Sequence, residues 1–446
     1  MSDSTVNVLK VGEQKIRALH LSWFAFFLTF VVWFSHAPLK PLIMETFSMT
    51  KEKLFMKALT KKTLLFAFAA CIAPTAYSAE TINEAFKETN ISGNFNFRYE
   101  NVGDDVGNDE LLSLRSRLTF NTGTYNGFSV LAEIEDVTHI LGVDGPLPGP
   151  FEVDQEVTEV DQIHLQYKND KVSVKLGRQL MVFDNQRFIG HVGWRQDRQT
   201  FDAASIKFQP IKGLNVDLAY LFQRNRIFGE EADARSSDTI LNSTYDTPFG
   251  KIVGYAYLLD DESRDEQSDT VGLRFTGSRG EKTKLLYTLE YADQSITDSG
   301  TDFDTEYLFA EIGGTYSGIT GKIGYELLSS DDGGASFTAP LGTLHAFNGW
   351  ADVFLGGGFN PTALPNGLVD TYLSLAGEIG GVKLTAVYHD FESDEGSDSY
   401  GTEWNFLATK SFGSGFSAGL KYADYSDDGF LGSDRDIFWG WVSYAF

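Results

Sequence analysis

The chain ends in Phe438-Trp439-Gly440-Trp441-Val442-Ser443-Tyr444-Ala445-Phe446. Counting back from the last residue, every second position carries Phe446, Tyr444, Val442, glycine and Phe438. Successive side chains of a β-strand point to opposite faces. The stretch therefore predicts a strand with one aromatic, apolar face that runs to the very last residue.

The same alternation recurs back through residues 80–446. Each candidate strand is near the length of about 9–11 residues that a tilted strand needs to cross a bilayer. No helical period competes over a long stretch. The candidate strands are 90–100, 111–121, 126–136, 158–168, 171–180, 200–209, 213–224, 238–247, 250–259, 268–277, 281–293, 304–315, 319–329, 366–378, 381–391, 400–412, 416–426 and 435–446.

The connections between these eighteen candidates alternate in length. Short turns follow every even strand, as at 248–249 and 317–318, whereas longer acidic connections follow the odd strands, as at 137–157 and 330–365. Short turns at one end and long loops at the other are typical of a membrane β-barrel. A soluble β-sandwich or propeller would show no such systematic asymmetry.

The final strand resembles the closing strand of bacterial outer-membrane β-barrels. We therefore predict an all-β, transmembrane antiparallel β-barrel of about 18 strands, with short periplasmic turns and long acidic external loops. The resemblance implies a place in the outer membrane, among lipid and lipopolysaccharide. It also implies that barrel assembly machinery recognises a terminal signal made by Phe438, Val442, Tyr444 and Phe446.

Composition agrees with a barrel. The chain has 44 Gly, 36 Phe and 19 Tyr, and barrels use aromatic residues at both membrane interfaces. Its net charge is −26, and because residues 1–79 are basic, the remainder is more acidic still. The acidity indicates either acidic loops at a cell surface or a solvated, salt-adapted surface. It argues against nucleic acid as a partner, and a single cysteine excludes a disulfide framework.

Two segments precede the barrel region 80–446. Residues 56–79 have the basic start, short apolar run and small residues of a secretory signal peptide. A lipoprotein reading, with lipid attached to Cys71, is the alternative. In residues 1–55, the stretch 18–34 is almost wholly apolar and could form one helix.

Residues 15–52 resemble the first helix of nitrate/nitrite transporters of the major facilitator superfamily, carried by Lys15-Ile16-Arg17-Ala18-Leu19-His20 and by His36-Ala37-Pro38-Leu39. The resemblance then stops. We expect 1–55 to be a gene fusion or a start-site artefact with Met56 as the working start. The alternative is a true inner-membrane helix, which would conflict with export.

The strand pattern also assigns side chains to the lumen. In 90–100, the side chains of Phe95 and Phe97 share the lipid face, and that of Arg98 lies on the other. Arginine binds carboxylates in a bidentate fashion, so basic walls would favour anionic solutes. The alternative is that acids of the wall simply pair with the bases. The predicted solute-binding or lumen residues are Arg98, Arg115, Arg117, Lys168, Lys175, Arg187, Arg195, Arg198, Lys207, Arg274 and Lys284. Arg178 falls on the apolar face, which predicts a strand end or a bulge there.

The order of strands, the segment Gly177-Arg178-Gln179 and the stretch Leu341-Gly342-Thr343-Leu344-His345-Ala346-Phe347-Asn348-Gly349-Trp350-Ala351-Asp352-Val353-Phe354 resemble the alginate-export family of outer-membrane porins. The resemblance covers roughly 90–446. It implies an eighteen-stranded barrel that passes an anionic polysaccharide through an Arg-rich lumen. Inward acids depart from a purely basic lumen.

These features predict a passive channel for hydrophilic, anionic solutes such as a uronate or another anionic saccharide. Two alternatives remain: a general or small-anion (nitrate-type) porin, and a structural or adhesion barrel that acts through its acidic loops. Catalysis has weak support, because only His389-Asp390 places a histidine beside an acid. His and Cys spacing predicts no metal site, and no cofactor is expected.

Overall fold

The structure is a computed structural model that describes residues 79–104, 107–141, 154–264 and 266–446. The predicted signal peptide and the predicted fragment at 1–55 lie outside the described residues, apart from Ala79. Everything below concerns the described part of the chain.

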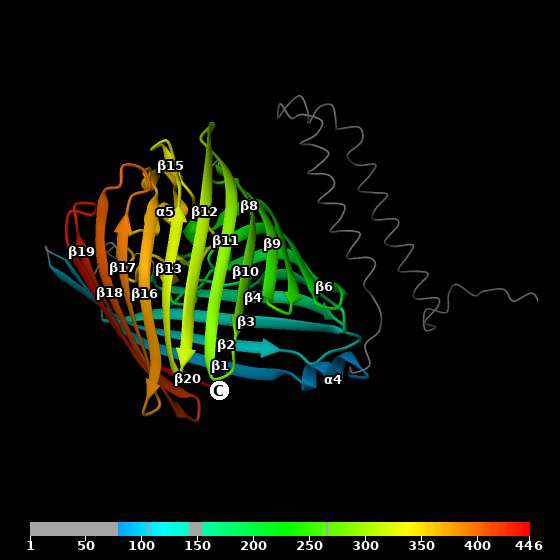
Figure 1. Ribbon diagram of the computed structural model, residues 1–446. Coiled ribbons are helices and arrows are strands. Elements are labelled where there is room, and N and C mark those ends of the chain that lie inside the picture. Colours follow the sequence, from blue (N-terminus) through cyan, green and yellow to red (C-terminus); the bar gives the residue numbers. More distant parts are fainter. Residues whose placement is uncertain (1–78, 105–106, 142–153, 265) are drawn as a thin grey trace, which may run out of the picture. The chain divides into compact units, whose positions relative to one another are not determined.

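Eighteen antiparallel strands form one closed barrel (Figure 1), because each strand pairs with the next and β20 pairs back with β1. This confirms the predicted fold class and all eighteen candidate strands. The strands are β1 Asn90–Asp104, β2 Asn108–Asn121, β3 Phe128–Leu141, β4 Val157–Lys168, β5 Val172–Gln179, β6 Thr200–Ile211, β7 Leu214–Asn225, β8 Ala234–Thr247, β9 Gly250–Asp261, β10 Glu266–Arg279, β11 Thr283–Asp298, β12 Thr301–Tyr316, β13 Ile319–Leu328, β16 Leu368–Ile379, β17 Val382–Glu392, β18 Ser399–Gly413, β19 Phe416–Asp427 and β20 Arg435–Ala445.

The barrel is apolar outside and polar inside. Large apolar side chains such as Leu273 and Leu289 are more than half exposed on the outer face. On the inner face, Glu100, Asp238 and Glu403 are almost fully buried. An apolar exterior of this extent requires lipid rather than water around it.

The strands extend further at the external end than the sequence indicated. β11 and β12 contain 16 residues each and meet at a turn through Ser299 and Gly300. Residues expected in the connections after the first and eleventh strands therefore belong largely to strands, as do half of those expected after the ninth. The predicted two-residue turns at 248–249 and 317–318 are present as expected.

The remaining elements are short. They are α4 Ile82–Lys87, η2 Glu230–Ala232, β14 Ser330–Asp331, β15 Ala335–Ser336, η3 Leu344–Ala346, α5 Leu355–Phe359 and η4 Pro361–Ala363. Helix α4 begins with a capping box at Thr81 and Glu84, which satisfies its free N–H groups. Among the described residues, no helix has the length and apolar character required to cross a membrane.

Both described ends of the chain lie at the short-turn end of the barrel (Figure 1). Gly123, in the turn after β2, donates its N–H to Ala85 of α4, and Ala445 donates to Gly415 in the turn after β18. Arg178 lies one residue before the end of β5, in agreement with the strand end predicted from its position on the apolar face. Its Nε donates to Asp202 at 2.9 Å.

The last residue closes the barrel seam. The backbones of Phe446 and Gly93 exchange two hydrogen bonds of 3.1 Å. The Phe446 ring stacks on Phe95 and also contacts Tyr444. A strand that ends in this way presents a row of aromatic rings to lipid at the seam.

Replacing Phe446 with Ala is expected to lower the yield of assembled barrel in the outer membrane, because two ring contacts worth about 0.5–1.5 kcal/mol each are lost at the seam. The measurement is the fraction of protein that migrates as a folded, heat-modifiable barrel. Phe412→Ala, which removes an equally exposed ring away from the seam, is the control. Equal yields for the two variants would contradict the role of Phe446 as an assembly signal.

Candidate functional site

Two connections at the external end fold into the lumen. Loop A (residues 180–199) joins β5 to β6, and loop B (residues 329–367) joins β13 to β16. Ile189 of loop A and Leu341 of loop B form a parallel bridge, and both side chains are almost fully buried. Gly190 N–H also donates to the Leu341 carbonyl at 2.8 Å. The two loops therefore support one another inside the barrel.

A first ion-pair cluster connects both loops to β1. Arg98 of β1 donates to Glu100 at 3.1 Å and also pairs with Asp154. Arg195 of loop A lies 3.3 Å from the same Asp154 carboxylate and pairs with Asp352 of loop B. All five side chains are at most 3% exposed. Buried charges of this kind are stable only as complete sets.

A second cluster connects loop A to β2, β3 and β4. Arg117 of β2 pairs with Glu135 of β3. Arg198 of loop A pairs with Glu133 of β3 and lies 2.5 Å from Asp161 of β4. In the β3–β4 ladder Val160 pairs with Ile134 and Gln162 with Glu133, which leaves Asp161 at a bulge.

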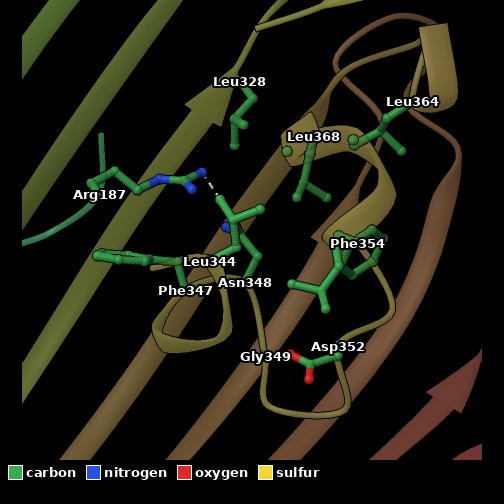
Figure 2. A pocket seen from close by; sticks show the side chains of 13 residues that line it. Arg187, Leu328, Leu344, Phe347, Asn348, Gly349, Asp352, Phe354, Leu364 and Leu368 are labelled. Carbon is green, nitrogen blue, oxygen red and sulfur yellow. Dashed lines mark hydrogen bonds between the residues drawn. The ribbon is translucent and has the colours of Figure 1, made fainter. Parts of the chain in front are cut away.

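Arg187 joins loop A to the opposite wall and to loop B. Its Nε donates to Glu326 of β13 at 2.6 Å. Its Nη2 donates to Asn348 of loop B at 3.1 Å (Figure 2). Its guanidinium also lies over the rings of Phe347 and Tyr307. The adjoining cavity, drawn in Figure 2, has a volume of about 20 Å³, enough for a single water.

Lys421 of β19 fixes both loops through an aromatic cage. Its Nζ lies 4.0 Å from the ring centres of Trp194 in loop A and Trp350 in loop B. Its Nζ also contacts His345 Nε2 at 2.5 Å and lies 5.3 Å from the ring centre of Trp439. Burial lowers the pKa of His345 to about 3, so the ring is neutral, its Nδ1–H donates to Asp352 and its Nε2 accepts from Lys421.

An open polar cavity of about 420 Å³ lies in the lumen below loop A. Its wall includes Lys207, Lys251 and Arg274, and also Asp184 and Asp217. Lys207 contacts Asp217 at 3.3 Å. The lumen is thus closely packed where the two loops meet and open toward the short-turn end.

Comparison with known proteins identifies the family. The sequence model of the alginate export family matches residues 86–327, more than half of the chain. The chain belongs to the alginate export family. The match stops before the stretch 341–354, so loop B lies outside it. No curated protein matches the sequence.

Solved structures share the fold. OccAB4 of Acinetobacter baumannii is 15% identical with a TM-score of 0.63, covering 80% of this chain and 98% of that one. A BenF-like porin of Pseudomonas fluorescens Pf-5 is 13% identical with a TM-score of 0.64, covering 81% and 99%. The outer membrane protein opdK of Pseudomonas aeruginosa is 14% identical with a TM-score of 0.63, covering 81% and 99%.

This member of the alginate export family is therefore a channel protein of the bacterial outer membrane, surrounded by lipid and lipopolysaccharide. Its family is one of channels, not of enzymes. The pair His389-Asp390 considered for catalysis is separated in the structure, because neighbouring residues of β17 point to opposite faces. His389 points into the lumen and contacts Asp370 at 2.9 Å instead.

The predicted lumen residues of this alginate export protein divide into two groups. One group forms ion pairs within 4 Å and consists of Arg98, Arg117, Arg187, Arg195, Arg198, Lys207 and Arg274. Among the described residues, the other group has no carboxylate at that distance and consists of Arg115, Lys168, Lys175 and Lys284. Arg115 instead donates to Asn94.

Sequence reasoning missed two parts of the site. Lys251 and Lys322 also face the lumen, and the alternation of Val253 and Tyr255 with outward residues could have revealed the first. The second part is the pair of acidic partners Asp154 and Asp352. Nothing in the sequence around them indicated that they would pair with lumen arginines.

Proposed function

We propose that this channel passes hydrophilic, anionic solutes of the uronate or anionic-saccharide class by passive diffusion. The observation that carries the proposal is a group of three lysines, Lys168 of β4, Lys175 of β5 and Lys207 of β6, on the lumen face toward the short-turn end. We call this group the lysine triangle.

The strand register places the lysine triangle in one patch. Lys168 and Lys207 both face Ser173 from opposite sides, and Lys175 lies two positions further along β5. Neighbouring strands are about 4.8 Å apart, so the Cα atoms of Lys168 and Lys207 lie within about 10 Å of each other. Asp217 is the one carboxylate within ion-pair distance of any of the three among the described residues.

This excess of positive charge favours anions over cations. Lys168 and Lys207 are exposed and Lys175 is half-buried, so a passing solute can reach them. Repeated carboxylates of an anionic saccharide could exchange between such flexible ammonium groups without binding tightly to any one. The family's description, alginate export, agrees with a solute of this class.

Replacing all three lysines of the triangle with Gln is expected to abolish most of the anion preference while conductance is kept. The measurement is the reversal potential of full-length protein in a planar bilayer under a salt gradient. Lys410→Gln is the control with matched chemistry, because Lys410 lies on the lipid face beside Phe412. Addition of oligogalacturonate should reduce the current of wild-type protein and of Lys410→Gln more than that of the triple variant.

A second candidate is a general or small-anion porin. Ion pairing of Arg98, Arg117 and Arg198 favours it, because paired guanidinium groups are less available to a solute. Wild-type conductance without ion preference would support a general porin and contradict the anionic-saccharide proposal, whereas an anion preference with no block by oligogalacturonate would support a small-anion porin. A wild-type protein that does not conduct at all would point to a structural or adhesion barrel.

A further inference from the structure

Three carboxylates from separate parts of the chain meet in the barrel wall. They are Glu135 of β3, Glu159 of β4 and Asp197 of loop A. Each has an oxygen within 4.8 Å of an oxygen of both others, and Glu135 and Asp197 are buried. Two oxygens bound to one Ca²⁺ at about 2.4 Å are separated by at most about 4.8 Å, so each pair of these carboxylates lies at a spacing that one shared ion allows.

The strand register makes this arrangement costly without a cation. Glu135 and Glu159 are direct cross-strand partners in the β3–β4 ladder. Like charges directly opposite one another destabilise a sheet, and loop A adds Asp197 as a third negative group.

Buried oxygens in the cluster also lack donors. Glu135 is fully buried and uses Oε2 to accept from Arg117, whereas its Oε1 has no hydrogen-bond donor among the described residues. Asp197 Oδ1 is also buried without a hydrogen-bond donor among these residues, and so is Oδ1 of the nearby Asp161. A buried carboxylate oxygen without a donor costs free energy, and three together indicate a missing positive partner.

The arginines nearby do not balance the charge. Four arginines face six carboxylates in this part of the wall, namely Arg115, Arg117, Arg178 and Arg198 against Glu133, Glu135, Glu159, Asp161, Asp197 and Asp202. Asp197 has no cation within ion-pair distance among the described residues. A divalent cation offsets most of this excess.

We propose that Glu135, Glu159 and Asp197 bind one Ca²⁺ ion that joins loop A to β3 and β4. Oxygen-only ligands of this kind suit a hard cation, and Ca²⁺ accepts irregular sets of carboxylates completed by water. This site is distinct from the lysine triangle and does not depend on which solute passes. Its role is to hold loop A against the wall.

The test is thermal unfolding of full-length protein, purified in detergent and free of lipopolysaccharide, in CaCl₂ or in EDTA. A ligand that binds the folded state raises the melting temperature with its concentration. We expect Ca²⁺ to stabilise the wild type and Glu281→Gln, which removes an exposed turn carboxylate remote from the site. Glu159→Gln and Asp197→Asn should lose this Ca²⁺ effect.

The two site variants also provide a check against simple misfolding. Each removes a repelling charge, so in EDTA each should melt at or above the temperature of the wild type. Calorimetric titration with CaCl₂ should give one site per wild-type chain and none in Asp197→Asn. No Ca²⁺ effect on the wild type, or an equal effect on all four proteins, would overturn the proposal.

Discussion

Replacing Arg195 with Met is expected to cost about 3–5 kcal/mol of stability, because it leaves buried carboxylates without their cation. Arg195 is 2% exposed and contacts Glu100, Asp154 and Asp352. Among the described residues, Arg98 would remain as the one arginine that pairs with the first two of these carboxylates. Methionine fills a similar volume, so the loss measures charge and hydrogen bonding more than packing.

The measurement is the urea midpoint of the full-length protein refolded into detergent or lipid. Lys207→Met is the control, because its side chain is 62% exposed and its pair with Asp217 should contribute at most about 1 kcal/mol. Adding Asp352→Asn to Arg195→Met should restore part of the loss. An Arg195→Met variant no less stable than Lys207→Met would show that the cluster is not required for the fold.

The fold was largely predictable from the sequence, because a barrel strand carries its signal locally. Alternation in β1 and β20 places Phe97 and Val442 outside and Arg98 and Trp439 inside without any knowledge of partners. Short turns, most of them two or three residues long, mark one end of the strands clearly. At the external end the signal weakens, because long strands such as β11 and β12 continue in polar residues beyond the membrane.

The site was predictable only in part. The inward position of its strand arginines can be predicted from the alternation of side chains, but the identity of their ion-pair partners cannot. Arg195 and Asp352 are 157 residues apart, and both belong to loops without periodicity. The sequence therefore predicted lumen arginines that a solute could contact. The structure shows most of those arginines in ion pairs with Asp or Glu side chains. Lys421 faces the lumen, yet nothing local indicated its cage of Trp194 and Trp350.

Loops A and B are closely packed where they meet in the lumen. At Gly342 of loop B, an added Cβ would lie 2.3 Å from the carbonyl oxygen of Arg187 and 3.1 Å from that of Ala339. These are backbone atoms and cannot rotate away, so a methyl group must push the two loops apart. The bridge between Ile189 and Leu341 lies beside this contact.

Gly342→Ala is accordingly expected to increase the single-channel conductance and the frequency of transitions between conductance levels. Overpacking of this kind costs about 1–3 kcal/mol, and one or two kcal/mol changes a population ratio by a factor of about 5–30. The measurement is single-channel recording of full-length protein in planar bilayers. The matched control is Gly254→Ala, since an added Cβ there meets no atom within 4 Å.

The result also decides how a large solute passes. If separating the loops raises conductance, loops A and B form the constriction, and a polysaccharide must displace them against the ion pairs of Arg187 and Arg195. If Gly342→Ala conducts like Gly254→Ala although its melting temperature falls, ions bypass the loops. The constriction would then lie elsewhere, and the open cavity beside the lysine triangle would be the place where selectivity is set.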